Sequence, residues 1–349
     1  MLKKSFTFRW NPTIMKATTK ATRHFAGCPL HFKGDDTVTE PRIDTRELQN
    51  RERGLAILAA AAGNTIWGFS FLFTKVAMKV TTPDVLLSIR FIIAVAIMTV
   101  LALMGKMPVR LKGKNLTPVI WLGITELGYF YFETWGVFYT NATFAGVVLS
   151  ITPVVSMACA AMFLKEYPTK RQALFCLLPI VGVAVVTVAG KSMGIIRPIG
   201  VVFLILTTLV SAAYKTINRS SASEFTGTER TYVMLVMCMV TFTFTALRSV
   251  NWSVAEYLRP LSDPTFVIMV LVLSVFCSIG CNVMVNYAAG RMSVVQMATY
   301  SGLTTICSMF SGILFLKEPV NAMSLLGTVL ILIGVWQVTK AEKQEEING

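Results

Sequence analysis

Five charged side chains lie inside long apolar stretches, where they are the residues best suited to chemistry. They are Lys75, Arg90, Glu126, Glu133 and Lys215. A charge at the centre of a membrane span costs about 2.5–3.5 kcal/mol or more, so by default it marks a binding or coupling site. The two histidines, His24 and His31, lie in the polar N-terminal stretch. No catalytic site, metal centre or cofactor is therefore expected within the apolar stretches.

Glu126 and Glu133 lie seven residues apart, with Tyr129 between them. On a helix they share one face, about 10 Å apart along the axis. This acidic and aromatic face is expected to line a cavity, although it could instead be part of an ion pair that only joins helices. If Lys215 reaches toward the membrane surface, Glu126 is unpaired and favours its neutral form. Glu126 could then take up and release a proton during transport.

Depth in the membrane predicts one ion pair. Arg90 and Glu133 each lie seven residues from the outer ends of their helices, about 10 Å deep. We therefore expect Arg90 to pair with Glu133, with Lys75 as a competing partner.

Two stripes recur at every fourth residue, the spacing of one helix face. The first is Trp67, Phe71 and Lys75, which is either ordinary packing or the aromatic wall of a substrate cavity. The second comprises Ser274, Ser278, Asn282 and Asn286. These polar residues either form hydrogen bonds between helices or line the same cavity.

The composition is typical of a membrane protein. Of the 349 residues, 54% are hydrophobic and 14% are charged, and the mean hydropathy is +0.63; soluble domains carry about 25% charged residues. The net charge of +14 is concentrated in the N-terminal stretch and in short segments between apolar runs. This pattern fits basic cytoplasmic loops rather than a nucleic-acid groove. The cysteines of the apolar runs, Cys277 and Cys281 among them, are expected to be buried thiols.

Ten apolar runs, separated by Pro, Gly, Asn or charged residues, predict an all-α integral membrane protein of ten transmembrane helices. The expected spans are 55–78, 84–104, 117–139, 142–164, 171–190, 198–218, 230–250, 265–288, 293–316 and 322–339. Lys and Arg are more frequent in the loops on the side of the N-terminus, so both termini are predicted to be cytoplasmic. Residues 1–53 are expected to form a basic cytoplasmic tail and residues 341–349 a polar C-terminal tail.

An internal repeat divides the chain. Residues 145–166 and 297–318 align at a constant offset of 152, and both end in FLKE followed by proline. Five helices separate the copies, and an odd number inverts the second half. Inverted repeats around a central site are typical of secondary transporters. The expected repeats are residues 54–191 and 192–340.

Several motifs resemble those of EamA-type members of the drug/metabolite transporter superfamily. They are WGFSFLFTK (67–75), IRF (89–91), VFYTNA (137–142), Pro153 with the first FLKE, and the second FLKE with Pro319. The resemblance covers residues 55–340. It implies two inverted five-helix halves around a central cavity, and export or exchange of amino acids and similar metabolites. Thr305 stands where the second half often has proline, so a kink there is in doubt.

Glu166 and Glu318 close the two FLKE motifs, just before Pro168 and Pro319. An acid near the start of the helix that follows is favourable. We interpret both as loop-capping residues of the repeat rather than as catalytic groups.

The sequence as a whole predicts a secondary transporter of small metabolites that works by alternating access in the plasma (inner) membrane. A channel-like facilitator and an intramembrane enzyme are the alternatives. The expected partners are a small-molecule substrate and the lipid bilayer, without nucleic acid, and a homodimer is compatible with the sequence.

The first prediction concerns topology. A cysteine placed within residues 112–115, the basic loop between the second and third spans, is expected to react with an impermeant thiol reagent only after the membrane is opened. Reaction in intact cells at this position would contradict a cytoplasmic N-terminus.

Overall fold

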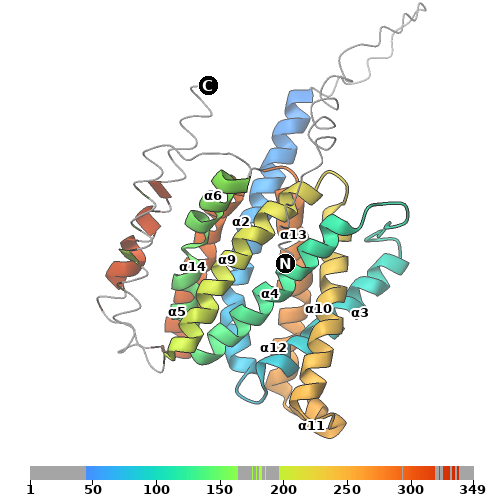
Figure 1. Cartoon of the computed structure of the whole chain (residues 1–349), viewed down its shortest axis with the longest axis vertical. Helices are drawn as coiled ribbons and strands as arrows, with labels where there is room; N and C mark the ends of the chain where they lie inside the picture. The colour runs from blue at the N-terminus through green and yellow to red at the C-terminus, as the bar shows by residue number, and fades with distance from the viewer. Residues whose placement is uncertain are drawn as a thin grey trace, which may run out of the picture. The chain divides into compact units, whose positions relative to one another are not determined.

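The computed structural model describes residues 45–163, 196–292 and 294–318, with scattered positions between 175 and 185 and between 322 and 337. This part of the chain is helical and contains no strand. The first half contributes α2 (Thr45–Ala77), α3 (Pro83–Leu103), α4 (Thr117–Tyr139), α5 (Ala142–Leu149) and α6 (Thr152–Phe163). The second half contributes α9 (Pro198–Ser221), α10 (Gly227–Ser249), α11 (Val254–Leu258), α12 (Pro264–Val272), the π-helix η3 (Leu273–Gly280), α13 (Cys281–Ala289) and α14 (Val294–Leu316). Figure 1 shows the α-helices of both halves with their labels.

Five helical stretches are long and apolar enough to cross a membrane. They are 51–77, 83–103, 198–221, 227–249 and 264–289. Shorter apolar helices lie at 142–156, 300–316 and 325–334. Within the described residues, helices thus occur at the expected places, whereas most of the expected span 171–190 and part of 322–339 lie outside those residues. Large apolar side chains such as Leu103, Val240 and Phe310 are exposed on the helix surfaces, as lipid contact requires. The count of ten spans stays a prediction.

Two element boundaries differ from expectation. α2 begins at Thr45, inside the expected tail, because residues 45–53 are rich in the helix formers Glu, Leu, Gln and Arg. The expected span 142–164 is broken at Ser150 and Ile151, just before Pro153. Proline lacks the N–H that a continuous helix needs. α14, which has Thr305 at the equivalent position, is unbroken.

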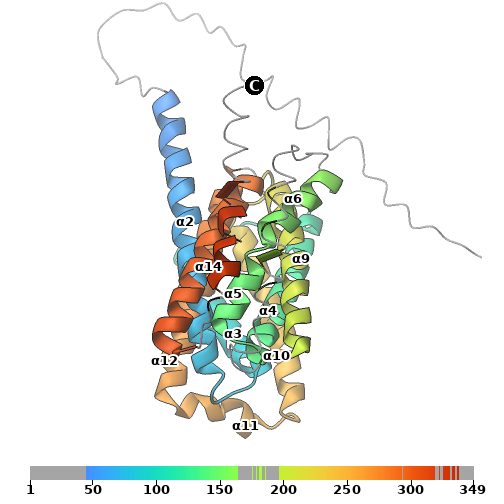
Figure 2. The same cartoon turned by 90° about the vertical axis from the view of Figure 1, so that its left-hand side faces the viewer.

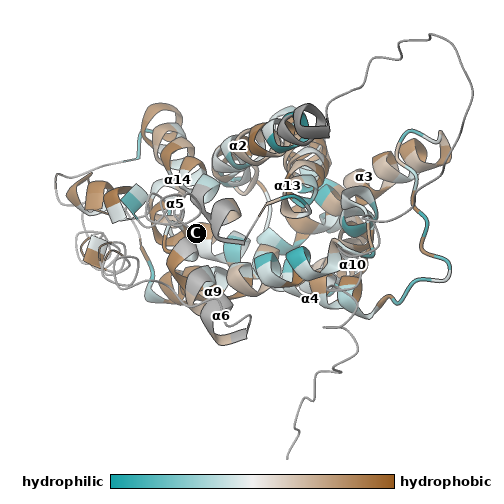
Figure 3. Cartoon of the chain, turned by 90° about the horizontal axis from the view of Figure 1, so that it is seen from above, coloured by the Kyte–Doolittle hydropathy of each residue, from teal (hydrophilic) through white to brown (hydrophobic). Residues whose placement is uncertain are grey.

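The two halves interlock rather than forming separate domains. α4 and α6 pack along α9, α3 and α4 pack against α10, and α5 and α6 pack against α14. Figure 2 shows α5 and α14 side by side, although they belong to opposite halves. Seen from above, hydrophilic residues of α4, α9 and α10 gather toward the middle of the bundle (Figure 3). The interior is therefore built from both halves.

Three arginines hold the end of α13. Arg219 donates to the carbonyl of Ala289 (3.1 Å) and Arg291 to that of Tyr287 (3.4 Å). Arg230, only 2% exposed, donates to the carbonyl of Asn286 (2.6 Å). The last carbonyls of a helix lack intrahelical partners, and cations there also complement its dipole. These arginines therefore have a structural role.

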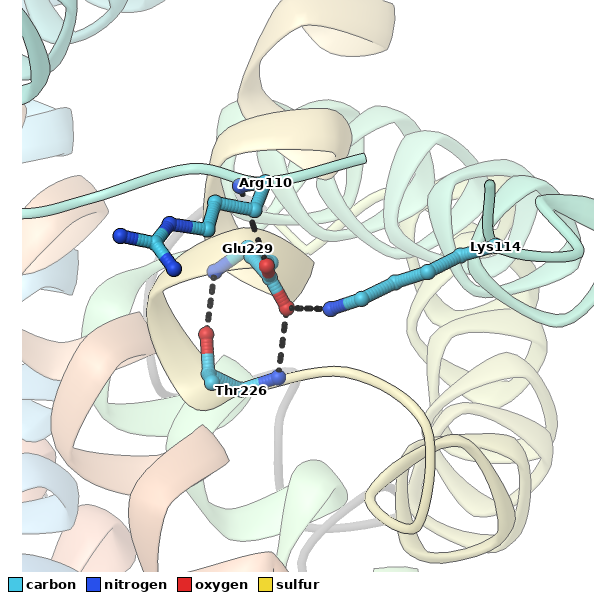
Figure 4. Close-up of polar contacts among 4 residues, drawn as sticks. All are labelled: Arg110, Lys114, Thr226 and Glu229. Atoms are coloured by element: carbon cyan, nitrogen blue, oxygen red, sulfur yellow. Dashed lines mark hydrogen bonds and ion pairs between the residues drawn. The ribbon is translucent and has the colours of Figure 1, made fainter. Parts of the chain in front are cut away.

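Glu229 connects the 104–116 segment to the start of α10 (Figure 4). Its carboxylate accepts from the backbone N–H of Arg110 (3.0 Å), from Lys114 Nζ (2.6 Å) and from the N–H of Thr226 (2.9 Å). Thr226 Oγ1 in turn accepts from the N–H of Glu229, which completes a capping box. One buried acid thus joins a connection of the first half to a helix of the second.

The second prediction follows from this junction. Glu229→Ala is expected to lower the free energy of unfolding by about 2–4 kcal/mol, because a cap and a charge-assisted contact are lost together. Thermal unfolding in detergent measures the change. The matched control is Glu224→Ala, at an exposed acid nearby, which should change stability by less than about 0.5 kcal/mol. Equal melting temperatures for the two variants would contradict the role of Glu229.

Candidate functional site

A cavity of about 60 Å³ lies between helices of both halves. A buried water needs roughly 10–15 Å³ by this measure, so the cavity has room for several waters or a small polar group. Four residues predicted from the sequence line it: Trp67, Phe71, Glu126 and Tyr129. Trp67 and Tyr129 bring their ring centroids to 5.9 Å across α2 and α4. The first two members of the aromatic stripe therefore face this cavity.

Glu126 supplies a buried acid to the cavity wall. The residue is 1% exposed, and its Oε1 has no hydrogen-bond partner among the described residues. Arg90 and Asn282 are its polar neighbours, Arg90 through the electrostatic attraction of its charge. The Oδ1 of Asn282 is likewise enclosed and unpartnered in this part of the chain. A buried acceptor without a donor is costly, so this corner favours a ligand or a proton.

Lys215, one of the five charged residues that the sequence placed inside apolar stretches, also lines this cavity. Its stem is half-buried, but its Nζ is enclosed and has no hydrogen-bond partner within the described residues. Lysines normally extend such a group toward water. No ion pair between Lys215 and Glu126 is present in the described structure, so the cavity holds an acidic and a basic side chain that do not contact each other. A lysine within the apolar α9 was the sequence signal for this role.

Arg90 and Glu133 are both buried but make no direct ion pair in the described structure. Arg90 Nε donates to Ser278 Oγ (2.7 Å), and its guanidinium lies 4.7 Å from the centre of the Phe130 ring. Glu133 accepts a hydrogen bond from Thr134 Oγ1 (3.1 Å). Arg90 still acts on Glu133 electrostatically. Arg90 therefore contacts the ring face of Phe130 and the hydroxyl of Ser278, whereas equal depth in the membrane had predicted a direct contact with Glu133.

Lys75, the expected competitor, does not join either acid. Its Nζ donates to the carbonyls of Val137 (2.8 Å) and Thr140 (2.5 Å) at the end of α4. The third member of the aromatic stripe therefore completes a helix end instead of lining the cavity.

The polar stripe Ser274, Ser278, Asn282 and Asn286 is fully buried and passes through the π-helix η3. In an α-helix, residues four apart drift by about 40°, and the wider π turn reduces this drift. Ser274 donates to the carbonyl of Arg90 (2.9 Å), and the amide oxygen of Asn286 accepts from Tyr214 (2.9 Å). Most of the stripe joins helices, and Asn282 alone turns toward Glu126.

Glu318, at the end of the second FLKE motif, caps a different helix from the one expected. Glu318 is a capping residue, but it caps α5 of the first half rather than the helix that follows it: its Oε1 accepts from the N–H of Ala142 (2.9 Å). Its Oε2 accepts from the N–H of Thr143 (2.8 Å). Glu166 and Pro319 lie outside the described residues.

Comparison with known proteins identifies a family and two related transporters. The model of the EamA-like transporter family matches twice, at residues 54–188 and 198–340. The chain is 32% identical over 284 residues to the uncharacterized transporter YcxC of Bacillus subtilis, covering 80% of this chain and 91% of that protein. It is 24% identical to an uncharacterized transporter of Archaeoglobus fulgidus, covering 79% and 95% respectively.

A solved crystal structure shares the fold. It superimposes with a TM-score of 0.60 at 16% identity, over 83% of this chain and 98% of that one. The two matched repeats, the apolar helices and the relatives' names agree on an integral membrane transporter. The chain belongs to the EamA-like transporter family.

Proposed function

We propose that this protein is a secondary transporter that exports or exchanges small amphoteric metabolites, such as amino acids, by alternating access. The observation that carries the proposal is that an acidic and a basic side chain, Glu126 and Lys215, line one cavity, and that Glu126 Oε1 and Lys215 Nζ have no hydrogen-bond partner among the described residues. Burying either charge alone is costly unless a partner compensates it. A ligand with an ammonium and a carboxylate group compensates both at once, and Trp67 and Phe71 offer an apolar wall for the rest of the ligand.

The interlocked halves support a carrier rather than a channel or an enzyme. Inverted repeats with a site between them work by rocking one part against another. The sequence contains no GxxxxGK[ST] nucleotide-binding motif, which favours a gradient as the energy source. In this proposal the protein lies in the plasma membrane with both termini in the cytoplasm. Saturation and counterflow in reconstituted vesicles distinguish a carrier from a channel-like facilitator.

The third prediction concerns Lys215. Lys215→Met removes the cation and keeps much of the stem, so the half-saturating concentration of a zwitterionic amino acid should rise about tenfold or more. Transport of analogues without a carboxylate should change far less. Exposed Lys79 provides the control, because Lys79→Met should leave both kinds of transport unchanged. An equal effect of Lys215→Met on both kinds of analogue would contradict carboxylate binding.

The fourth prediction concerns coupling by Glu126. Glu126→Gln resembles the protonated acid permanently, so the variant should fold and exchange substrate but lose accumulation driven by a pH gradient. Counterflow and gradient-driven uptake, measured in the same vesicles, separate these activities. Full gradient-driven uptake by Glu126→Gln would exclude the coupling role. Loss of both activities would instead assign Glu126 to binding the amino group of the substrate.

A further inference from the structure

One end of the bundle is closed by a contact between the two halves. The chain leaves α14 through Lys317, in the left-handed region at φ 52°, which few lysines adopt. This turn brings the Glu318 carboxylate over the start of α5, where both of its oxygens accept backbone N–H groups. The first amides of a helix have no intrahelical acceptor, and an acid there is further favoured by the helix dipole.

Close packing extends from this carboxylate along α5 and α14. Ser308 Oγ donates to the carbonyl of Ala142 (2.7 Å), and Thr305 Oγ1 donates to that of Gly146 (3.1 Å). A methyl group at Gly146 would overlap Ser308, and one at Gly312 would overlap Thr143. The absence of side chains at the two glycines therefore lets the helices touch at this end.

Farther from Glu318, residues of these helices line the cavity. Met297, Ser301 and Thr304, in the first half of α14, line the cavity, as do Leu149 and Thr152 at the break between α5 and α6. Arg219 and Ala289, at the ends of α9 and α13, also line it. The cavity thus lies toward the ends of α9 and α13, and Glu318 makes its contact with α5 away from these lining residues.

We propose that Glu318 is the releasable clasp of the outer gate. In this conformation the carboxylate holds α5 against α14 and closes the cavity to the outside. This end of the bundle faces outward because the N-terminus is predicted to be cytoplasmic. Release of the clasp lets the two helices part, so that the substrate can cross the outer end. The proposal rests on the alternating-access function proposed above.

The clasp is suited to reversible use. Its bonds join a side chain to the first backbone amides of a helix, and water can replace a carboxylate at such groups when the helices part. Lys75 donates hydrogen bonds to the carbonyls of Val137 and Thr140, which do not involve Glu318. These bonds therefore keep α2 and α4 joined when the Glu318 carboxylate leaves the start of α5. The positive charge of Lys75 also acts on Glu318 and favours its return.

Accessibility at Thr143 tests the clasp directly. Thr143 is 1% exposed and contributes its N–H to the contact, so Thr143→Cys places a thiol beneath the clasp and leaves that N–H in place. In intact cells, an impermeant maleimide should label this cysteine about tenfold faster when Glu318→Ala is added, because two charge-assisted bonds are lost. The chain without Thr143→Cys gives the background from native cysteines.

The matched control is Glu256→Ala, at an exposed acid of α11, which should leave the labelling rate unchanged. Glu318→Gln keeps one acceptor oxygen but loses the charge, and it should give an intermediate rate. If Glu318→Ala is not recovered as a folded protein, the Glu318→Gln variant decides the question. An unchanged rate in a folded Glu318 variant overturns the clasp.

Labelling needs no substrate, so it separates this proposal from the transport proposal. Normal saturable flux with unchanged labelling would overturn the clasp and leave the transport function intact. Faster labelling in the Glu318 variants, without counterflow of any amphoteric substrate in the parent protein, would overturn the proposed substrate class and leave the gate in place.

Discussion

Polar groups buried where water is scarce must find their partners within the protein, and this constraint organises the whole bundle. It acts most strongly at helix ends, where backbone groups lack intrahelical partners. Glu318 supplies acceptors for the start of α5, and Arg219, Arg230 and Arg291 supply donors for the end of α13. The Glu318 contact lies at the end of the bundle that we propose to be the outer gate. The arginine contacts lie at the end nearer the cavity. Against helix ends satisfied in this way, Glu126 Oε1 and Lys215 Nζ differ because they have no hydrogen-bond partner among the described residues, which is why we propose that they bind a ligand.

Features that depend on local sequence were predictable. Hydropathy placed helices where the structure has them, because the need to match a bilayer acts on each segment separately. The four-residue spacing of Trp67 and Phe71 placed them on one face of α2, and both line the cavity. Their spacing likewise placed Glu126 and Tyr129 on one face of α4, and both line the same cavity. Burial of Arg90, Glu126 and Glu133 followed from their position within apolar runs.

Features that depend on rotation about helix axes or on distant partners were not predictable. Depth gave Arg90 and Glu133 the same height in the membrane, but height does not say which way a side chain points, and Arg90 turns to Ser278 and Phe130. The π-helix η3 has no simple signature in the sequence. Capping by Glu318 was expected, but its partner lies in the other half of the chain, beyond the reach of any local rule.

The clasp has a consequence for biosynthesis. Glu318 follows Ala142 by 176 residues, and a ribosome that adds 5–20 residues per second needs about 9 to 35 seconds to cover that distance. Throughout this interval the start of α5 exists without the carboxylate that completes it. The first half is therefore made as an unfinished structure that waits for the last part of the second. Cells must keep such a nascent chain safe from misassembly and proteolysis until its final helices are inserted.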